Sequence, residues 1–156
     1  MNRSVIVKIA LLVTWMLIIF LLSNEPSSVS SERSGAIVEV AKTLGTSLPN
    51  DVLTFVTRKL AHIIAYFILG ILMFLVVRAY TPKARKAVLL SVLFLCLYAI
   101  TDELHQTLVP GRSGEVRDVL IDTTAGALGA AGTYYIFTLH AKRKVLISGK
   151  NPQNKV

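Results

Sequence analysis

The chain has 156 residues, of which 53% are hydrophobic and 17% are charged, with a mean hydropathy of +0.61 and a formal net charge of +8. A soluble domain of this length usually carries more charge, so the composition predicts a small integral membrane protein that forms one domain. The basic residues flank apolar segments and form no zinc-finger, arginine-rich or basic–aromatic pattern, which argues against a nucleic-acid partner.

Four apolar segments approach the roughly 20 residues that a helix needs to cross a bilayer. They cover residues 5–22, 60–77, 84–101 and 119–139, and none contains proline. We expect all four to be transmembrane helices, because lipid offers no partner to an unpaired backbone group. The first segment is followed by no small-x-small cleavage pattern, so we expect it to be retained as the first helix.

A long polar loop separates the first two apolar segments. Apolar residues between positions 37 and 44 recur in it at helical spacing, and Gly45 follows them. This pattern predicts a short amphipathic helix that lies on the outer membrane surface. Asn50 or Asp51 is expected to cap a helix that continues into the second apolar segment. The predicted fold is therefore an all-α bundle of four transmembrane helices with one interfacial helix.

The charged residues are distributed unequally between the two ends of these segments. Eleven of the 17 basic residues, and none of the nine acidic ones, lie at the N-terminus, between the second and third segments, or in the C-terminal tail. The positive-inside rule therefore predicts that both termini are cytoplasmic and that the acidic residues lie on the extracytoplasmic face. Residues 142–156 are basic and polar, and we expect them to form a flexible tail.

The second apolar segment begins with polar residues on one helical face. Arg58, His62 and Tyr66 are four residues apart, and Lys59 adjoins Arg58. Arginine and lysine bind phosphate or carboxylate, and histidine can act as a general acid or base near neutral pH. Taken alone, the same set is also typical of an interfacial basic pair, a hydrogen-bonded histidine and a tyrosine of the aromatic belt.

The third apolar segment ends in a dense polar group. Asp102, Glu103, His105 and Gln106 follow it within five residues, and Asp102 shares a helical face with Gln106. A Pro-Gly turn then carries Arg112, which we expect to reach over the mouth of the bundle.

Asp118 and Asp122 lie one helical turn apart at the start of the fourth apolar segment. That segment is rich in alanine and glycine, which let helices approach closely in lipid. We expect both carboxylates to point into the bundle, since a charge exposed to hydrocarbon costs at least about 2.5–3.5 kcal/mol. Their expected partners are Arg58, His62 and Arg112. With Glu103 they could instead hold a divalent metal, because hard cations prefer carboxylate oxygens.

Together these motifs resemble the VanZ-like family of small bacterial membrane proteins over most of the chain. Members often have an acidic residue where this chain has Ala65 and a glycine where it has Ala125. The resemblance implies a role in the bacterial cell envelope and a link to resistance against the glycopeptide teicoplanin, without implying a reaction. It rests on Ser23-Asn24-Glu25-Pro26, Arg58-Lys59-Leu60-Ala61-His62 with Tyr66, Asp102-Glu103-Leu104-His105-Gln106, Pro110-Gly111-Arg112-Ser113-Gly114, and Asp118 with Asp122.

The sequence leaves three functions open. The first is an enzyme that modifies an anionic lipid or a lipid-linked wall precursor. Its catalytic candidates are His62, Asp102, Glu103, His105, Asp118 and Asp122, and its substrate-binding candidates are Arg58, Lys59, Tyr66, Gln106 and Arg112. The second is a non-catalytic binder of the same ligands. The third is a membrane scaffold in which these charges clamp the helices together. An enzyme requires His62, Glu103, His105, Asp118 and Asp122 to converge on one open cavity.

Overall fold

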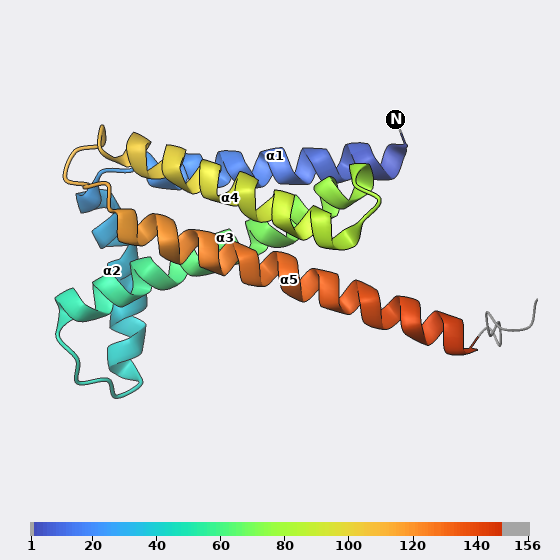
Figure 1. Cartoon of the computed structure of the whole chain (residues 1–156). Helices are drawn as coiled ribbons and strands as arrows, with labels where there is room; N and C mark the ends of the chain where they lie inside the picture. The colour runs from blue at the N-terminus through green and yellow to red at the C-terminus, as the bar shows by residue number, and fades with distance from the viewer. Residues whose placement is uncertain (1, 148–156) are drawn as a thin grey trace, which may run out of the picture.

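The structure is a computed structural model that describes residues 2–147. These residues form five helices, namely α1 (Arg3–Ser23), α2 (Ser27–Thr43), α3 (Asn50–Tyr80), α4 (Ala84–Gln106) and α5 (Val116–Ile147) (Figure 1). The predicted all-α class is therefore confirmed for the described part of the chain. Each of the four predicted apolar segments lies inside a helix.

Within residues 2–147, three helices are long and apolar enough to cross a membrane: α1, α3 and α4. The 32-residue helix α5 has sufficient length, but its glycines, threonines and Asp122 make it less apolar. The fourth transmembrane span therefore stays a prediction. Large apolar side chains of α5 are nevertheless exposed on the bundle surface, including Leu128 and Ile136, as they are on α1 and α4.

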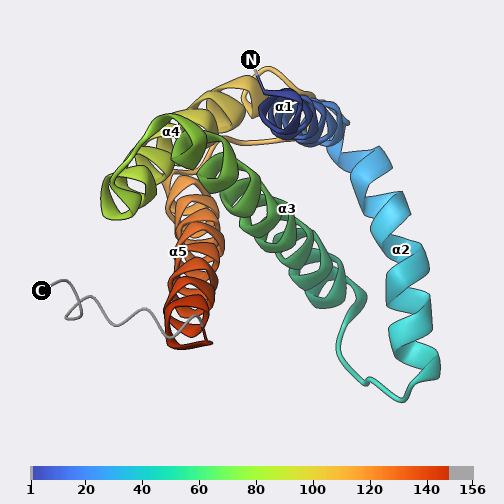
Figure 2. The ribbon, with the colours of Figure 1, turned by 90° about the vertical axis from the view of Figure 1, so that its right-hand side faces the viewer.

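Helices α1, α3, α4 and α5 pack as a bundle, and α2 lies outside it. Figure 2 shows α3 between α2 and α5, in agreement with the contacts that α3 makes with both. The interior contains fully buried residues from three helices: Tyr66, Leu69 and Phe74 of α3, Leu95 of α4, and Ala130 of α5. Helix α3 is thus the central element, and its polar residues His62 and Tyr66 contact α5 and α4, respectively.

Helices α3 and α5 run in the same direction and touch through their backbones. A Cβ atom added at Gly70 would overlap the carbonyl oxygen of Gly126, and one added at Gly129 would overlap that of Phe67. The predicted close approach of the glycine-rich segment is therefore confirmed, and its partner is α3.

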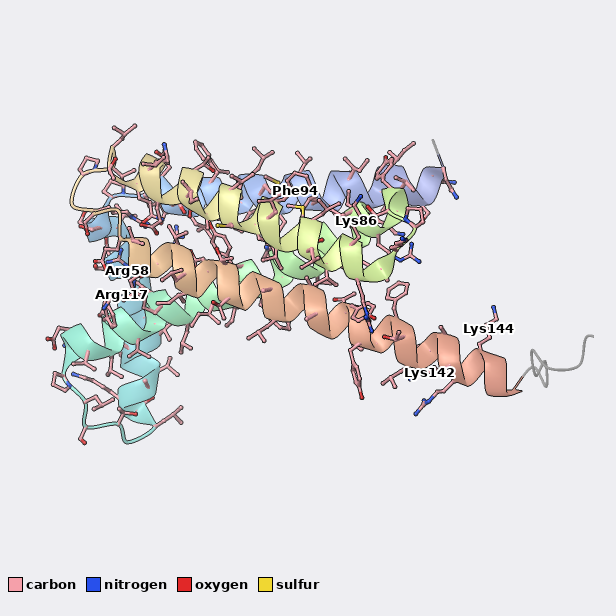
Figure 3. All side chains as sticks on the ribbon, viewed as in Figure 1. Arg58, Lys86, Phe94, Arg117, Lys142 and Lys144 are labelled. Carbon is pink, nitrogen blue, oxygen red and sulfur yellow. The ribbon has the colours of Figure 1, made fainter. Side chains whose placement is uncertain are left out.

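The charged residues divide between the two ends of the bundle as the sequence predicted. The start of α1, the α3–α4 connection and the end of α5 lie at one end, and the α4–α5 loop lies at the other (Figure 1). Lys142 and Lys144 lie toward the first end, whereas Arg58 and Arg117 lie at the second (Figure 3). The orientation of these ends in a membrane stays a prediction.

Three local expectations need correction. Helix α2 is longer than predicted and begins at Ser27; after it ends, Gly45 adopts a left-handed φ of 94°. Asn50 is the first residue of α3 and not its cap, because Pro49 occupies that position and α3 has no side-chain cap. Residues 142–147, the first part of the predicted tail, continue α5 as helix, since lysine and arginine favour helix and suit a helix C-terminus. Residues 148–156 of the predicted tail lie outside the described residues.

Candidate functional site

Asp102 of α4 accepts hydrogen bonds from three helices at a single oxygen. Its Oδ2 atom is 3.1 Å from Oγ of Ser23, 3.1 Å from the Tyr66 hydroxyl, and 3.3 Å from Nε2 of Gln106. The residue is only 4% exposed. Its other oxygen, Oδ1, is buried and has no hydrogen-bond partner among the described residues. Neutral donors therefore fix the orientation of this carboxylate and leave one oxygen unoccupied.

His62 of α3 and Asp122 of α5 form the second element of the site. Nδ1 of His62 is 3.3 Å from Oδ2 of Asp122. Asp122 is 1% exposed, and His62 is half-buried. The structure thus places Asp122 next to one of its three predicted partners. The small residues after Asp122 allow α5 to lie close enough to α3 for this contact.

Asp118 pairs with Lys59 and not with any of the three partners that we expected for it. The reason is the rotation of about 100° between successive helical residues. Lys59 faces α5, so its neighbour Arg58 is turned away from Asp118. Oδ1 of Asp118 is buried without a partner in the described part of the chain.

Glu103 and His105 point away from Asp102 on opposite sides of α4. Oε2 of Glu103 accepts a hydrogen bond of 2.8 Å from the backbone N–H of Glu115, just before α5. The His105 ring packs 4.6 Å from Phe20 of α1, and its Nε2 lies 3.1 Å from Oδ1 of Asn24. Neither residue lines the cavities described below. The expected convergence of five catalytic candidates is therefore wrong for Glu103 and His105. An enzyme that depends on all five is not supported, and catalysis could rest only on the three that line one of those cavities, His62, Asp118 and Asp122.

Arg112 fastens the α4–α5 loop over the end of the bundle, as the sequence predicted. Its guanidinium donates to the carbonyl oxygens of Glu25 at 2.8 Å and Leu22 at 3.2 Å, and to Oε1 of Gln106 at 3.3 Å. All three acceptors are neutral. Burial lowers the pKa of Arg112, and the nearby charge of Arg58 lowers it further. Gln106 joins this loop to the buried network, because its amide nitrogen donates to Asp102.

Two cavities, each of about 180 Å³, share Arg58, His62 and Arg112 in their walls. The first, which we call the apolar cavity, lies between α1, α2 and α3 and is also lined by Ile19, Leu22, Ser23, Glu25, Ser30, Arg33, Ser34, Ile37, Thr57, Ala61, Ala65 and Tyr66. The second, the polar cavity, lies between α3, α5 and the α4–α5 loop and is also lined by Phe55, Lys59, Gln106, Gly111, Ser113, Glu115, Asp118, Ile121 and Asp122.

Arg58 differs from the other basic residues of the site. No hydrogen bond or ion pair joins it to another residue within the described ranges, whereas Lys59 binds Asp118 and Arg112 binds three acceptors. Arg58 is half-buried and lines both cavities. Its charge is therefore available to an anion that enters either cavity.

One group of side chains in residues 2–147 has the spacing of a metal site. An imidazole nitrogen of His62 and one carboxylate oxygen each of Asp102 and Asp122 all lie within 4.8 Å of one another. The sequence pointed to Glu103, Asp118 and Asp122 for this role, and only Asp122 belongs to the observed group. Glu103 binds the loop, and Asp118 binds Lys59.

Ser23 is a site residue that sequence reasoning missed. It is 2% exposed and donates to Asp102 across the α1–α4 interface. The sequence feature that pointed to this role is a serine directly at the end of an apolar segment, in the Ser-x-x-Pro stretch. Two further contacts hold α1 in place: Trp15 Nε1 donates to the carbonyl of Ala65 at 2.9 Å, and the Tyr98 hydroxyl donates to that of Met16 at 2.7 Å.

A family model described as VanZ/LLP1 matches residues 8–138, a range that includes every polar residue of the site. No curated protein and no solved structure matches the chain.

Proposed function

Because the chain belongs to the VanZ/LLP1 family, we propose that it is a bacterial cell-envelope protein that binds and modifies the phosphate-bearing head group of an anionic lipid or lipid-linked wall precursor. The modification would take place on the extracytoplasmic face and contribute to tolerance of teicoplanin-type glycopeptides. The observation that carries this proposal is the pair of arginines, Arg58 and Arg112, beside the His62–Asp122 contact in one cavity wall.

The two arginines favour an anionic ligand. Neither forms an ion pair with a carboxylate in the described residues, although Glu115, Asp118 and Asp122 line the same cavity. Burial and the nearby charge of Arg58 lower the pKa of Arg112, and a phosphate between the two guanidinium groups would offset their repulsion. Guanidinium groups bind phosphate oxygens in pairs, which gives orientation as well as affinity.

The apolar cavity suits the hydrocarbon part of the same ligand. Ile19 and Leu22 of α1 and Ala65 of α3 line it, and it shares Arg58, His62 and Arg112 with the polar cavity. A lipid has the matching arrangement, since its phosphate separates the acyl or prenyl chain from the polar head. This adjacency supports a lipid-linked ligand over a free anion.

His62 and Asp122 supply groups for chemistry on the bound head group. A histidine that contacts a carboxylate can transfer a proton, while the carboxylate fixes the orientation of its ring. Both residues line the polar cavity next to Arg58, so a head group held there would lie beside them. We propose His62 as the general acid or base and Asp122 as the residue that orients it.

Two other functions are alternatives. A non-catalytic binder would use the same arginines and cavities without the proton transfer. A scaffold would use the Lys59–Asp118 and His62–Asp122 contacts and the Asp102 network only to hold α1, α3, α4 and α5 together. The scaffold does not account for Arg58, which binds no described side chain.

The test expresses the chain in a teicoplanin-sensitive bacterium with Arg58→Ala, His62→Ala or the control Arg117→Ala. Arg117 is a good control because its exposed side chain lies at the same end of the bundle and binds only Glu115 among the described residues (Figure 3). We expect Arg58→Ala and His62→Ala to lose tolerance at unchanged membrane protein levels, and Arg117→Ala to keep it. A wild-type chain that confers no tolerance would contradict the proposal.

Mass spectrometry of envelope lipids and wall precursors separates the alternatives. We expect the wild-type chain to shift the mass of one anionic species, and His62→Ala to abolish that shift. Tolerance without any mass change would favour the non-catalytic binder. Loss of the protein from the membrane in both variants would favour the scaffold.

A further inference from the structure

We propose that His62, Asp102 and Asp122 bind one divalent transition-metal ion, Zn²⁺ or Mn²⁺, in the wall of the polar cavity. The ligand atoms of the three residues lie within 4.8 Å of one another. The 3.3 Å between His62 and Asp122 is long for a hydrogen bond, and it matches the edge of about 3.3 Å between ligands in a tetrahedral site with bonds of about 2.0–2.1 Å.

The hydrogen bonding of Asp102 is the independent observation that points to a bound cation. Three donors occupy Oδ2, and Oδ1 is buried with no partner in the described part of the chain. A buried acceptor without a partner costs free energy that a cation would recover. Carboxylates that bind metals are held in this way, with hydrogen bonds from outer residues that fix the ligand oxygen.

Charge balance leads to the same conclusion. No lysine or arginine in residues 2–147 forms an ion pair with Asp102 or Asp122, and the one side-chain partner of Asp122 among these residues is His62. Arg112 donates to two carbonyls and to Gln106 and forms no ion pair with either carboxylate. One divalent ion bound by two carboxylates and a neutral imidazole gives a site with no net charge. Such a site avoids the cost of isolated charges inside a membrane bundle.

The ligand types select the class of ion. Imidazole nitrogen with carboxylate oxygens suits Zn²⁺ or Mn²⁺, whereas Ca²⁺ and Mg²⁺ prefer sites made of oxygen alone. Three protein ligands also leave coordination positions open.

Those open positions would face the polar cavity, which His62 and Asp122 both line. A phosphate oxygen of the head group could occupy one of them, between the ion and the two arginines, and be polarised there. This last step rests on the proposed function, whereas the metal site does not. With the ion bound, His62 and Asp122 serve as its ligands, so polarisation by the ion takes the place of proton transfer by His62.

The test measures metal binding by the full chain purified in detergent and stripped with a chelator. Zn²⁺ or Mn²⁺ alone is added, and bound metal is determined by elemental analysis after excess ion is removed. We expect one ion per wild-type chain and at least about tenfold weaker binding in Asp102→Asn and Asp122→Asn. The matched control is Glu103→Gln, which alters a buried acid one residue from Asp102 and should retain the ion. A wild-type chain that takes up no ion, or a Glu103→Gln variant that loses it equally, would overturn the proposal.

If the aspartate variants fail to fold, X-ray absorption at the metal edge identifies the ligands of the ion in the wild-type chain. The wild-type spectrum should show one imidazole together with oxygen ligands, and a spectrum with oxygen alone would overturn the site. Both measurements are made without lipid, so a negative result would contradict the metal site and would leave the proposed function untouched. A metal-free chain that still binds anionic lipid through Arg58 would refute only the metal site.

Discussion

The hydroxyl of Tyr66 donates to Oδ2 of Asp102 across 3.1 Å, and Tyr66 is fully buried between α3 and α4. Tyr66→Phe removes this donor with little change in shape. Because polar contacts in membrane bundles contribute about 0.6–1.7 kcal/mol, we expect the free energy of unfolding to fall by that amount. Unfolding in SDS, followed by circular dichroism, measures the difference.

The control for this variant is Tyr135→Phe, since the exposed side chain of Tyr135 forms no hydrogen bond within residues 2–147. Its stability should equal that of the wild-type chain. Equal stability of Tyr66→Phe and Tyr135→Phe would mean that the contact with Asp102 contributes nothing to folding. If the metal site is present, Tyr66→Phe should also weaken ion binding by about tenfold, because it removes a donor that holds a ligand.

Gly70→Ala tests the backbone contact between α3 and α5. The added methyl group would overlap the carbonyl oxygen of Gly126, and no flexible side chain lies there to move aside. We expect a loss of about 1–3 kcal/mol in the free energy of unfolding, or failure to accumulate in the membrane. Gly132→Ala is the matched control on α5, because a Cβ atom there meets nothing within 4 Å. Comparable loss in both variants would contradict the close approach at Gly70.

A double-mutant cycle measures the Lys59–Asp118 ion pair. Both side chains are about four-fifths buried, so Lys59→Met leaves a poorly solvated carboxylate at position 118. We expect the double variant Lys59→Met with Asp118→Leu to recover part of the loss, with a coupling of about 0.5–3 kcal/mol. The exposed pair Arg117–Glu115 provides the comparison and should show a coupling below about 1 kcal/mol. Equal coupling energies in both pairs would mean that burial does not strengthen the Lys59–Asp118 ion pair.

Reporter fusions test the orientation that the charge pattern predicts. A reporter active only outside the cytoplasm should be active after Gly114, in the loop that holds Arg112 over the site. The same reporter should be inactive after Lys83, between α3 and α4. The opposite pattern would place the site on the cytoplasmic face and exclude an extracytoplasmic head group as its ligand.

The helices were predictable from the sequence because their apolar content is a local property. Every predicted segment lies within a helix, and the close packing of the glycine-rich segment was also anticipated. The continuation of α5 through residue 147 was not predicted. A basic and polar composition indicates that a segment is solvated, but it does not specify the backbone conformation.

The pairing of side chains was only partly predictable, because it depends on how each helix is rotated in the bundle. Lys59 and Arg58 are neighbours in sequence, yet they face different elements, so Asp118 binds Lys59. The same reason separates His105 and Glu103, which flank the inward face of α4: His105 packs against Phe20 of α1, and Glu103 binds the backbone just before α5. Spacing along one helix identifies residues that share a face, but the direction of that face is set by contacts with other helices.

The contact between Gly70 and Gly126 has a mechanical consequence for the site. His62 lies eight residues before Gly70, about 12 Å along α3, and Asp122 lies four residues before Gly126, about 6 Å along α5. Rotating α3 by about 5° around this fixed point would displace His62 by about 1 Å, enough to make or break its contact with Asp122. The width of the site is thus governed by small residues that never touch its ligand, and substitutions there could tune it while every polar group stays in place.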